Sequence, residues 1–148
     1  GYPPGSTFKI VTSAAGMGSG KYSPGSRIAT SAGIRMGGFF FGEHSGSGYG
    51  VIGFRQALAV SSNTFFYRMG LKIGPEEISK WGQKLGIGPV TDLKLPGGTH
   101  GTIPTPEEKE RLYKEPWYAG DTISMSIGQG LVLATPLEMA VVVSAIAN

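Results

Sequence analysis

The sequence contains no cysteine among its 148 residues, and this absence excludes several kinds of protein. A chain without cysteine has no disulfide framework and no thiolate metal site. Its only histidines are His44 and His100, which argues against a zinc centre, because such centres need several histidine or cysteine ligands. We therefore expect neither a metal nor a cofactor.

Long apolar runs are also missing. No run reaches the length of about eighteen residues that a membrane-spanning helix needs, and the start lacks the charged-then-apolar pattern of a secretion signal. The formal net charge of +3 comes from dispersed lysines and arginines, so we expect no nucleic-acid partner. With 40% hydrophobic residues, residues 1–148 have the size and composition of one domain.

The first chemical motif lies near the start, where Ser6 and Lys9 are three residues apart. Prolines and a glycine precede Ser6 and apolar residues at helical spacing follow it, which predicts a helix over residues 6–17 with Ser6 in its first turn. Side chains three apart share one helix face, so the Lys9 amine can reach the Ser6 hydroxyl. Burial would lower the pKa of Lys9 and let it act as the base for a serine nucleophile.

Alone, this spacing is a weak signal. With 14 serines and 8 lysines, about one Ser-x-x-Lys is expected by chance, and Ser6 could be a helix cap beside a solvated Lys9.

The triplet Ser61-x-Asn63 between two apolar segments is rarer than Ser-x-x-Lys, since about 0.2 such triplets are expected by chance. In a polar turn between helices, Ser61 can relay a proton and the Asn63 carboxamide can hold a substrate amide. An ordinary helix cap is the alternative.

Together the motifs resemble the transpeptidase domain of class B penicillin-binding proteins, most closely the cell-elongation type. The resemblance covers nearly the whole chain and extends to residues 2–5, 63–67, 116–123 and 127–130. It implies an α+β fold of the penicillin-binding protein and serine β-lactamase type. Residues 1–148 would be a partial transpeptidase domain, mainly α-helical, with little of the antiparallel sheet and no second domain.

The family's third motif, Lys-Thr-Gly or Lys-Ser-Gly on a β-strand, is absent, because none of the lysines precedes Thr-Gly or Ser-Gly. We therefore expect a truncated chain that stops before that strand and also lacks the N-terminal membrane anchor of similar full-length proteins. One donor of the oxyanion hole would come from that strand. Losing one such donor costs roughly a hundred- to a thousandfold in rate, so we expect the fragment itself to be inactive or impaired.

The resemblance implies acyl transfer in peptidoglycan synthesis. The D-Ala-D-Ala end of a stem peptide would acylate Ser6, with Lys9 as the base, Ser61 as the proton relay and Asn63 as the ligand of the substrate amide. An amine of a neighbouring stem peptide would then take the acyl group, and β-lactam antibiotics would acylate the same serine. The parent protein would work with the cell-elongation machinery at the periplasmic face of the bacterial inner membrane.

Two other functions stay open at this point. A serine β-lactamase shares the first two motifs but must activate water for deacylation, commonly with an extra carboxylate. The glutamate pairs of this sequence instead follow helix-start signals, where acidic residues complement the helix dipole. The other alternative is a non-catalytic scaffold or β-lactam-binding module that is acylated at most once.

The remaining sequence predicts a largely helical chain. Helices are predicted at residues 54–60, 63–71, 74–86, 105–113 and 135–147 from apolar periodicity and from start signals. Residues 21–53 are rich in glycine and serine, which predicts irregular structure with room for one short hairpin and a surface position for His44. The last helix is apolar on nearly every side, so we expect the fragment to self-associate through it.

Overall fold

The computed structural model describes residues 3–88 and 100–147. In these ranges the chain forms a 3-10 turn η1 (Gly5–Phe8), the helices α1 (Lys9–Gly18), α2 (Phe54–Val60), α3 (Asn63–Ile73), α4 (Pro75–Leu85), α5 (Pro106–Tyr113), α6 (Ala119–Ser126) and α7 (Pro136–Ala147), and the strands β1 (Arg27–Ala29), β2 (Gly33–Met36), β3 (Phe39–Gly42) and β4 (Val51–Gly53). The predicted α+β class with mainly helical content is confirmed.

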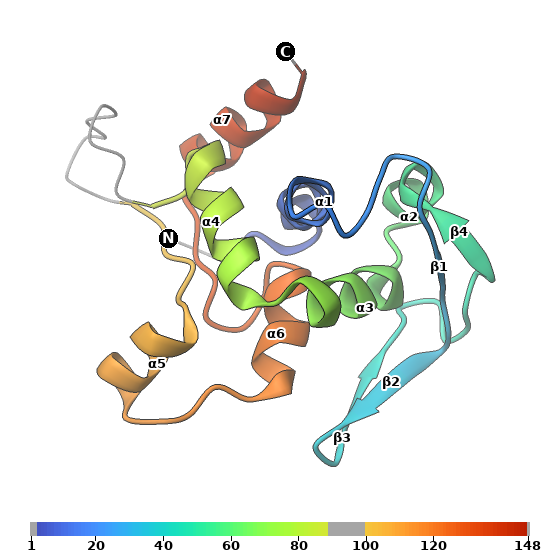
Figure 1. The fold of residues 1–148 in the computed structure, drawn as a ribbon, viewed down its shortest axis with the longest axis horizontal. Coiled ribbons are helices and arrows are strands. Elements are labelled where there is room, and N and C mark those ends of the chain that lie inside the picture. Colours follow the sequence, from blue (N-terminus) through green and yellow to red (C-terminus); the bar gives the residue numbers. More distant parts are fainter. Residues whose placement is uncertain (1–2, 89–99, 148) are drawn as a thin grey trace.

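Helix α1 lies in the middle of the helical part and packs against α2, α3 and α4 (Figure 1). Its buried face carries Val11 and Ala15, both with no exposed surface. Gly82 of α4 leaves room for the Ile103 side chain, because a Cβ atom there would lie 2.0 Å from Ile103 Cδ1, whereas Val11 Cγ1 of α1, at 3.6 Å, would be in ordinary contact. The fully buried rings of Phe65 and Phe66 extend this core into α3, with centroids 4.9 Å apart.

The segment from residue 21 to 53 is more regular than the sequence prediction. Strand β1 pairs antiparallel with β4, and β2 pairs antiparallel with β3, so the segment forms two separate two-stranded sheets (Figure 1). Gly37 and Gly38 form the turn between β2 and β3 with φ angles of 58° and 82°, as a two-residue hairpin loop requires. The β2–β3 pair is the short hairpin that the sequence analysis allowed. Strands of three or four residues are too short for a clear alternating pattern, which is why the β1–β4 pair was not predicted.

Most predicted helices are confirmed, and two of them show the predicted threonine caps. The Thr105 side chain accepts the Glu108 N–H at 3.3 Å at the start of α5. At the start of α7, Thr135 Oγ1 accepts the Glu138 N–H at 3.1 Å while Glu138 Oε1 accepts the Thr135 N–H at 2.8 Å, which completes a capping box. Helix α6 was not predicted, because its Gly, Thr and Ser residues are weak helix formers.

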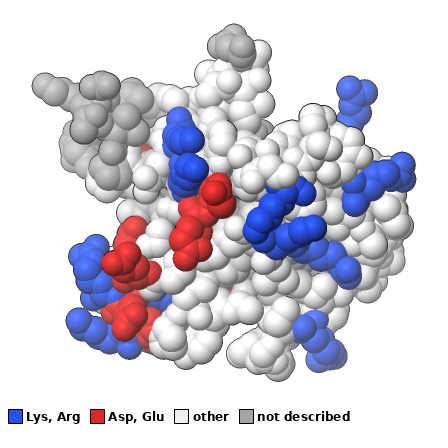
Figure 2. All heavy atoms as spheres, viewed as in Figure 1, with Lys and Arg blue, Asp and Glu red and all other residues white. Residues whose placement is uncertain are grey.

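Charged side chains are spread over the face shown in Figure 2. Acidic side chains gather on the α4 and α5 side of the molecule, and basic side chains occur on both sides of the view. This distribution agrees with the dispersed positive charge expected from the sequence. Among the helices of the two described ranges, none combines the length and the apolarity of a bilayer span.

Candidate active site

Ser6 lies in the turn η1 that leads directly into α1. The predicted helix over residues 6–17 is therefore a 3-10 turn followed by an α-helix, and the Lys9 N–H donates to the Ser6 carbonyl oxygen at the junction. Ser6 is exposed, whereas Lys9 is only 1% exposed. The Gly5 N–H donates to the Gly128 carbonyl at 3.0 Å, and a Cβ on Gly128 would lie 2.5 Å from Gly5 O. Glycine is thus required where this segment supports the Ser6 turn.

The second motif forms a turn between α2 and α3, which we call the Ser61–Asn63 turn. Ser61 has φ 55° and ψ 48°, a left-handed conformation that costs a residue other than glycine roughly 1–2 kcal/mol. The Ser61 N–H donates to Leu58 O at 3.3 Å and the Ser62 N–H to Ala57 O at 2.9 Å. This pair of bonds is the Schellman ending of a helix, in which glycine usually takes the left-handed position. Ser61 is strained in this position, but unlike glycine it places a hydroxyl group beside Lys9 and Ser6.

The Lys9 ammonium joins the two motifs. Its Nζ atom donates to Ser61 O, to Ser61 Oγ and to Asn63 Oδ1, each at 2.8 Å, and lies 3.5 Å from Ser6 Oγ. The Ser61 hydroxyl in turn donates to Ser6 Oγ at 3.1 Å. The structure therefore brings all four residues that the sequence singled out into one connected cluster.

The environment of Lys9 increases the fraction of its amine that is neutral. Burial lowers the pKa of Lys9 from 10.5 to about 8, although the nearby Glu43 carboxylate acts in the opposite direction. At pH 7, a pKa near 8 leaves about a tenth of the amine neutral, compared with about one part in three thousand for an ordinary lysine. The site therefore contains an amine that can accept a proton near neutral pH.

The distances favour a proton path from Ser6 to Lys9 through Ser61. Proton transfer needs heavy atoms about 2.6–3.2 Å apart, and the direct Ser6 Oγ to Lys9 Nζ distance is 3.5 Å. The two steps through Ser61 Oγ, of 3.1 and 2.8 Å, fall within that range. Without a substrate bound, the Ser61 hydroxyl can thus connect the Ser6 hydroxyl with the Lys9 amine.

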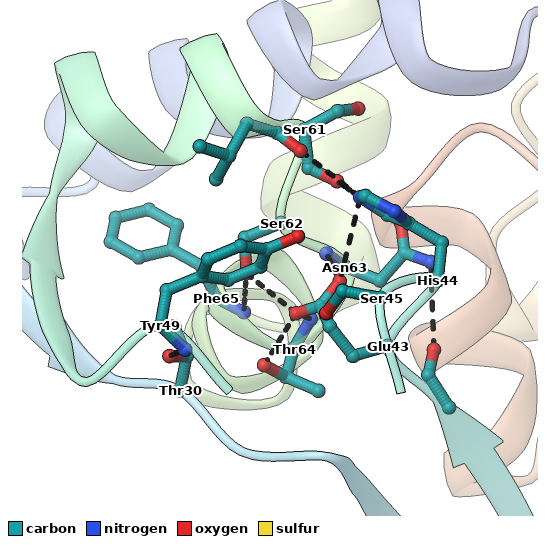
Figure 3. Close-up of polar contacts among 12 residues, drawn as sticks. Thr30, Glu43, His44, Ser45, Tyr49, Ser61, Ser62, Asn63, Thr64 and Phe65 are labelled. Carbon is teal, nitrogen blue, oxygen red and sulfur yellow. Dashed lines mark hydrogen bonds and ion pairs between the residues drawn. The ribbon is translucent and has the colours of Figure 1, made fainter. Parts of the chain in front are cut away.

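Glu43 is a site residue that the sequence analysis missed. It follows β3, is 5% exposed, and its carboxylate lies beside the Ser61–Asn63 turn (Figure 3). Burial alone would raise the pKa of Glu43, but hydrogen bonds from Asn63, Ser62 and Thr64 lower it, and the net pKa is below the ordinary value. A lone glutamate in a segment rich in glycine and serine, outside any helix start, was the only available signal.

His44 lies on the surface, as expected, and also contacts the turn. Its side chain is 49% exposed, and its Nε2 atom lies 3.0 Å from both Val60 O and Ser61 O. Because both partners are carbonyl oxygens, Nε2 must carry the proton that is shared between them. In the part of the chain that the structure describes, no group of three histidine, aspartate or glutamate side chains is arranged to hold a metal ion.

Comparison with known proteins gives one consistent family. The whole chain, residues 1–148, matches the family described as penicillin binding protein transpeptidase domain. The peptidoglycan D,D-transpeptidase MrdA of Acinetobacter baumannii is 34% identical over 149 residues, which cover 99% of this chain and 22% of that relative. This chain therefore spans about a fifth of the length of that relative.

Two solved structures show the same fold over most of the chain. Pseudomonas aeruginosa PBP2 in complex with WCK 5153 superposes with a TM-score of 0.91 at 30% identity, covering 99% of this chain and 32% of that one. The complex between PBP2 and MreC from Helicobacter pylori gives a TM-score of 0.85 at 32% identity, covering 93% of this chain and 26% of the matched one.

Proposed function

Because the chain belongs to the penicillin-binding protein transpeptidase family, we propose that residues 1–148 are part of the transpeptidase domain of a peptidoglycan D,D-transpeptidase. One observation carries the proposal. Lys9 Nζ is held 2.8 Å from Ser61 Oγ and from Asn63 Oδ1, and Ser61 Oγ lies 3.1 Å from Ser6 Oγ. An exposed hydroxyl connected to a buried amine of lowered pKa is the arrangement that serine acyl transfer needs.

In the first half-reaction Ser6 is the nucleophile. Its Oγ attacks the carbonyl carbon of the penultimate D-alanine of a D-Ala-D-Ala stem peptide while its proton passes through Ser61 to the neutral Lys9 amine. The carbon–nitrogen bond of the resulting tetrahedral intermediate then breaks. The departing D-alanine nitrogen takes the proton back from the Lys9 ammonium through Ser61, which leaves the stem peptide as an ester of Ser6.

The second half-reaction restores Ser6. An amine of a neighbouring stem peptide attacks the ester carbonyl carbon and gives up a proton to the neutral Lys9 through Ser61. The carbon–oxygen bond of the ester breaks, and Ser6 Oγ regains a proton from the same network. One amide bond has been exchanged for another, so the reaction needs no cofactor.

Asn63 is placed to hold the substrate rather than to move protons. Its Oδ1 atom accepts from Lys9 at 2.8 Å, which fixes the orientation of the carboxamide. Among the described residues, its Nδ2 group donates to Gly42 O over a long distance of 3.5 Å. The carboxamide nitrogen carries two hydrogens, so the second can donate to a carbonyl oxygen of the stem peptide or of a β-lactam side chain.

We infer that β-lactams acylate Ser6, because their strained amide resembles the donor peptide bond and their leaving group stays attached. The whole protein would act with cell-elongation partners at the periplasmic face of the bacterial inner membrane. The similarity to a PBP2 that forms a complex with MreC supports the elongation partners.

The test is intact-mass spectrometry after prolonged incubation with benzylpenicillin. We expect an increase by the mass of one antibiotic molecule that persists, and its loss in Ser6→Ala and Lys9→Ala. Ser19→Ala, at the end of the same helix, is the matched control and should still be labelled. An adduct that survives in Ser6→Ala, or no adduct on the full-length protein that carries residues 1–148, would contradict the proposal. Rapid turnover of a chromogenic cephalosporin would identify a β-lactamase instead.

A further inference from the structure

We propose that Glu43 and His44 are positioning residues that hold the Ser61–Asn63 turn in the geometry required by Ser6 and Lys9. The proposal rests on the proposed function, because it gives these two neighbours a role in the reaction only if Ser61 and Asn63 take part in it. Among the described residues, neither side chain forms a hydrogen bond with Ser6. Both act through the turn, Glu43 from the α3 side and His44 from the α2 side (Figure 3).

Glu43 uses both carboxylate oxygens to fix the start of α3. Its Oε1 accepts the Asn63 N–H, and its Oε2 accepts the Ser62 hydroxyl at 2.7 Å, the Thr64 N–H at 3.0 Å and the Thr64 hydroxyl at 2.8 Å. The Oε1 bond is 2.6 Å long, as expected for an ionised acceptor. The first N–H groups of a helix have no partner within the helix. Glu43 therefore sets the direction in which α3, and with it the Asn63 side chain, leaves the turn.

His44 fixes the other side of the turn. Its Nε2–H is shared between the carbonyl oxygens of Val60 and Ser61, each at 3.0 Å. The Ser61 oxygen is also an acceptor for the Lys9 ammonium at 2.8 Å. His44 thus holds the carbonyl group that faces Lys9, and it does so at the residue whose backbone is left-handed.

The strained backbone of Ser61 explains why the turn needs stabilising contacts from other residues. A left-handed conformation is less favourable for serine than a right-handed one, so without support the turn would relax toward the right-handed conformation. Relaxation would rotate Ser61 O and Ser61 Oγ away from Lys9, and both now lie 2.8 Å from its Nζ. A displacement of about 1 Å at a catalytic group can lower a rate by about a hundredfold. The contacts of Glu43 and His44 oppose this relaxation.

The chain contains a matched control for Glu43. Glu138 is also a buried carboxylate, 3% exposed, and accepts the N–H groups of Gly88, Gly101 and Thr135 at 2.8, 2.7 and 2.8 Å. It has the same chemistry and comparable burial but caps α7, and none of its hydrogen bonds reaches the Ser61–Asn63 turn. If the role of Glu43 is merely structural, substituting either glutamate should lower stability and leave the acylation rate constant of the folded protein unchanged.

The experiment measures the second-order rate constant for acylation by benzylpenicillin, expressed per folded molecule, in wild type, Glu43→Gln, Glu138→Gln and His44→Phe. Both glutamine variants should lose stability, because a carboxamide nitrogen cannot accept the bonds made by the second carboxylate oxygen. Only Glu43→Gln should also lower the rate constant of the folded fraction, by about ten- to a hundredfold. His44→Phe should fold, since His44 is half exposed, and should lower the rate constant by about three- to tenfold. Equal rate constants for the folded Glu43→Gln and Glu138→Gln would overturn the proposal.

A second measurement separates this proposal from the proposed function. The NMR Cα and Cβ chemical shifts of Ser61 report its backbone conformation whether or not acylation occurs. We expect both shifts to move toward right-handed values in Glu43→Gln and in His44→Phe, and to stay unchanged in Glu138→Gln. If the full-length wild type is not acylated but the Ser61 shifts move as expected, the proposed function fails and the positioning of the turn stands. Unchanged Ser61 shifts in both Glu43→Gln and His44→Phe would refute the positioning itself.

Discussion

Replacing Lys9 by methionine should stabilise the folded chain at neutral pH while preventing acylation of Ser6. Lys9 is 1% exposed, and burial lowers its pKa from 10.5 to about 8, so the ammonium form is less favourable in the folded than in the unfolded state. Methionine has a similar length and no charge, and the ring of Phe66, whose centroid lies 5.9 Å from Lys9 Nζ, gives it an apolar neighbour. The buried Lys9 amine thus lowers the stability of the fold while it provides a base for Ser6.

The magnitude follows from the pKa difference. Lowering the pKa of Lys9 from 10.5 to about 8 corresponds to at most about 3 kcal/mol of destabilisation by the ammonium below pH 8. The variant leaves Ser61 O, Ser61 Oγ and Asn63 Oδ1 without their Lys9 donor, at a cost of about 1 kcal/mol for each acceptor that water does not reach. We therefore expect Lys9→Met to be about 1 kcal/mol more stable than wild type at pH 7.

The sign of the pH dependence is fixed as well. Because the folded pKa lies below the unfolded one, the unfolded chain binds more protons between about pH 8 and 10.5, and wild-type stability rises with pH across that window. The free energy of unfolding of Lys9→Met should therefore exceed that of wild type at pH 7 and fall below it at high pH. The difference should change by about 3 kcal/mol in total across this window.

Urea denaturation of both proteins at pH 7, 8, 9 and 10 measures this difference. Lys80→Met serves as the control, because it removes one positive charge from an exposed position of α4. A stability difference between Lys9→Met and wild type that stays flat over this range would refute the lowered pKa, and with it the assignment of Lys9 as the base.

Two further predictions concern the core and the surface. Gly82→Ala should destabilise the fold by about 1–3 kcal/mol in urea denaturation, because its Cβ would lie 2.0 Å from Cδ1 of the buried Ile103 side chain; an unchanged midpoint would show that this side chain can turn away at no cost. Leu137, Val143 and Ile146 on α7 are 49%, 46% and 48% exposed, so light scattering should detect self-association at high concentration that Val143→Lys reduces. A monodisperse wild-type monomer would contradict the second prediction.

The sequence was informative about the site where the chemistry depends on short spacings. Ser6 and Lys9 are three residues apart in a helical turn, and Ser61 and Asn63 are two residues apart in a turn, so each pair could be placed from local rules alone. That Lys9 contacts Ser61 across 52 positions depends on the packing of α1 against α2 and α3. No local pattern contains that information, and only the resemblance to a family predicted it.

Glu43 and His44 were beyond sequence reasoning for the same reason. They belong to a segment predicted to be irregular, and the strands β2 and β3 that carry Glu43 to the turn are only four residues long. Their role depends on contacts with residues about twenty positions later, at the ends of two helices. A charged residue without a local helix-start role is the general signal that could direct attention to such positions.

The Ser61–Asn63 turn lies between a buried cation and a buried anion. Lys9 bonds to acceptors of the turn, namely Ser61 O, Ser61 Oγ and Asn63 Oδ1, while Glu43 bonds to its donors, including the Ser62 hydroxyl and the Asn63 N–H. The turn cannot shift without leaving one of these charges unpaired, and an unpaired buried charge costs several kcal/mol. In the neutral form that Lys9 needs in order to accept the Ser6 proton, the amine has one N–H fewer, so one of its bonds to the turn must weaken. The bonds of Glu43 then remain to keep Ser61 and Asn63 in place until Lys9 is protonated.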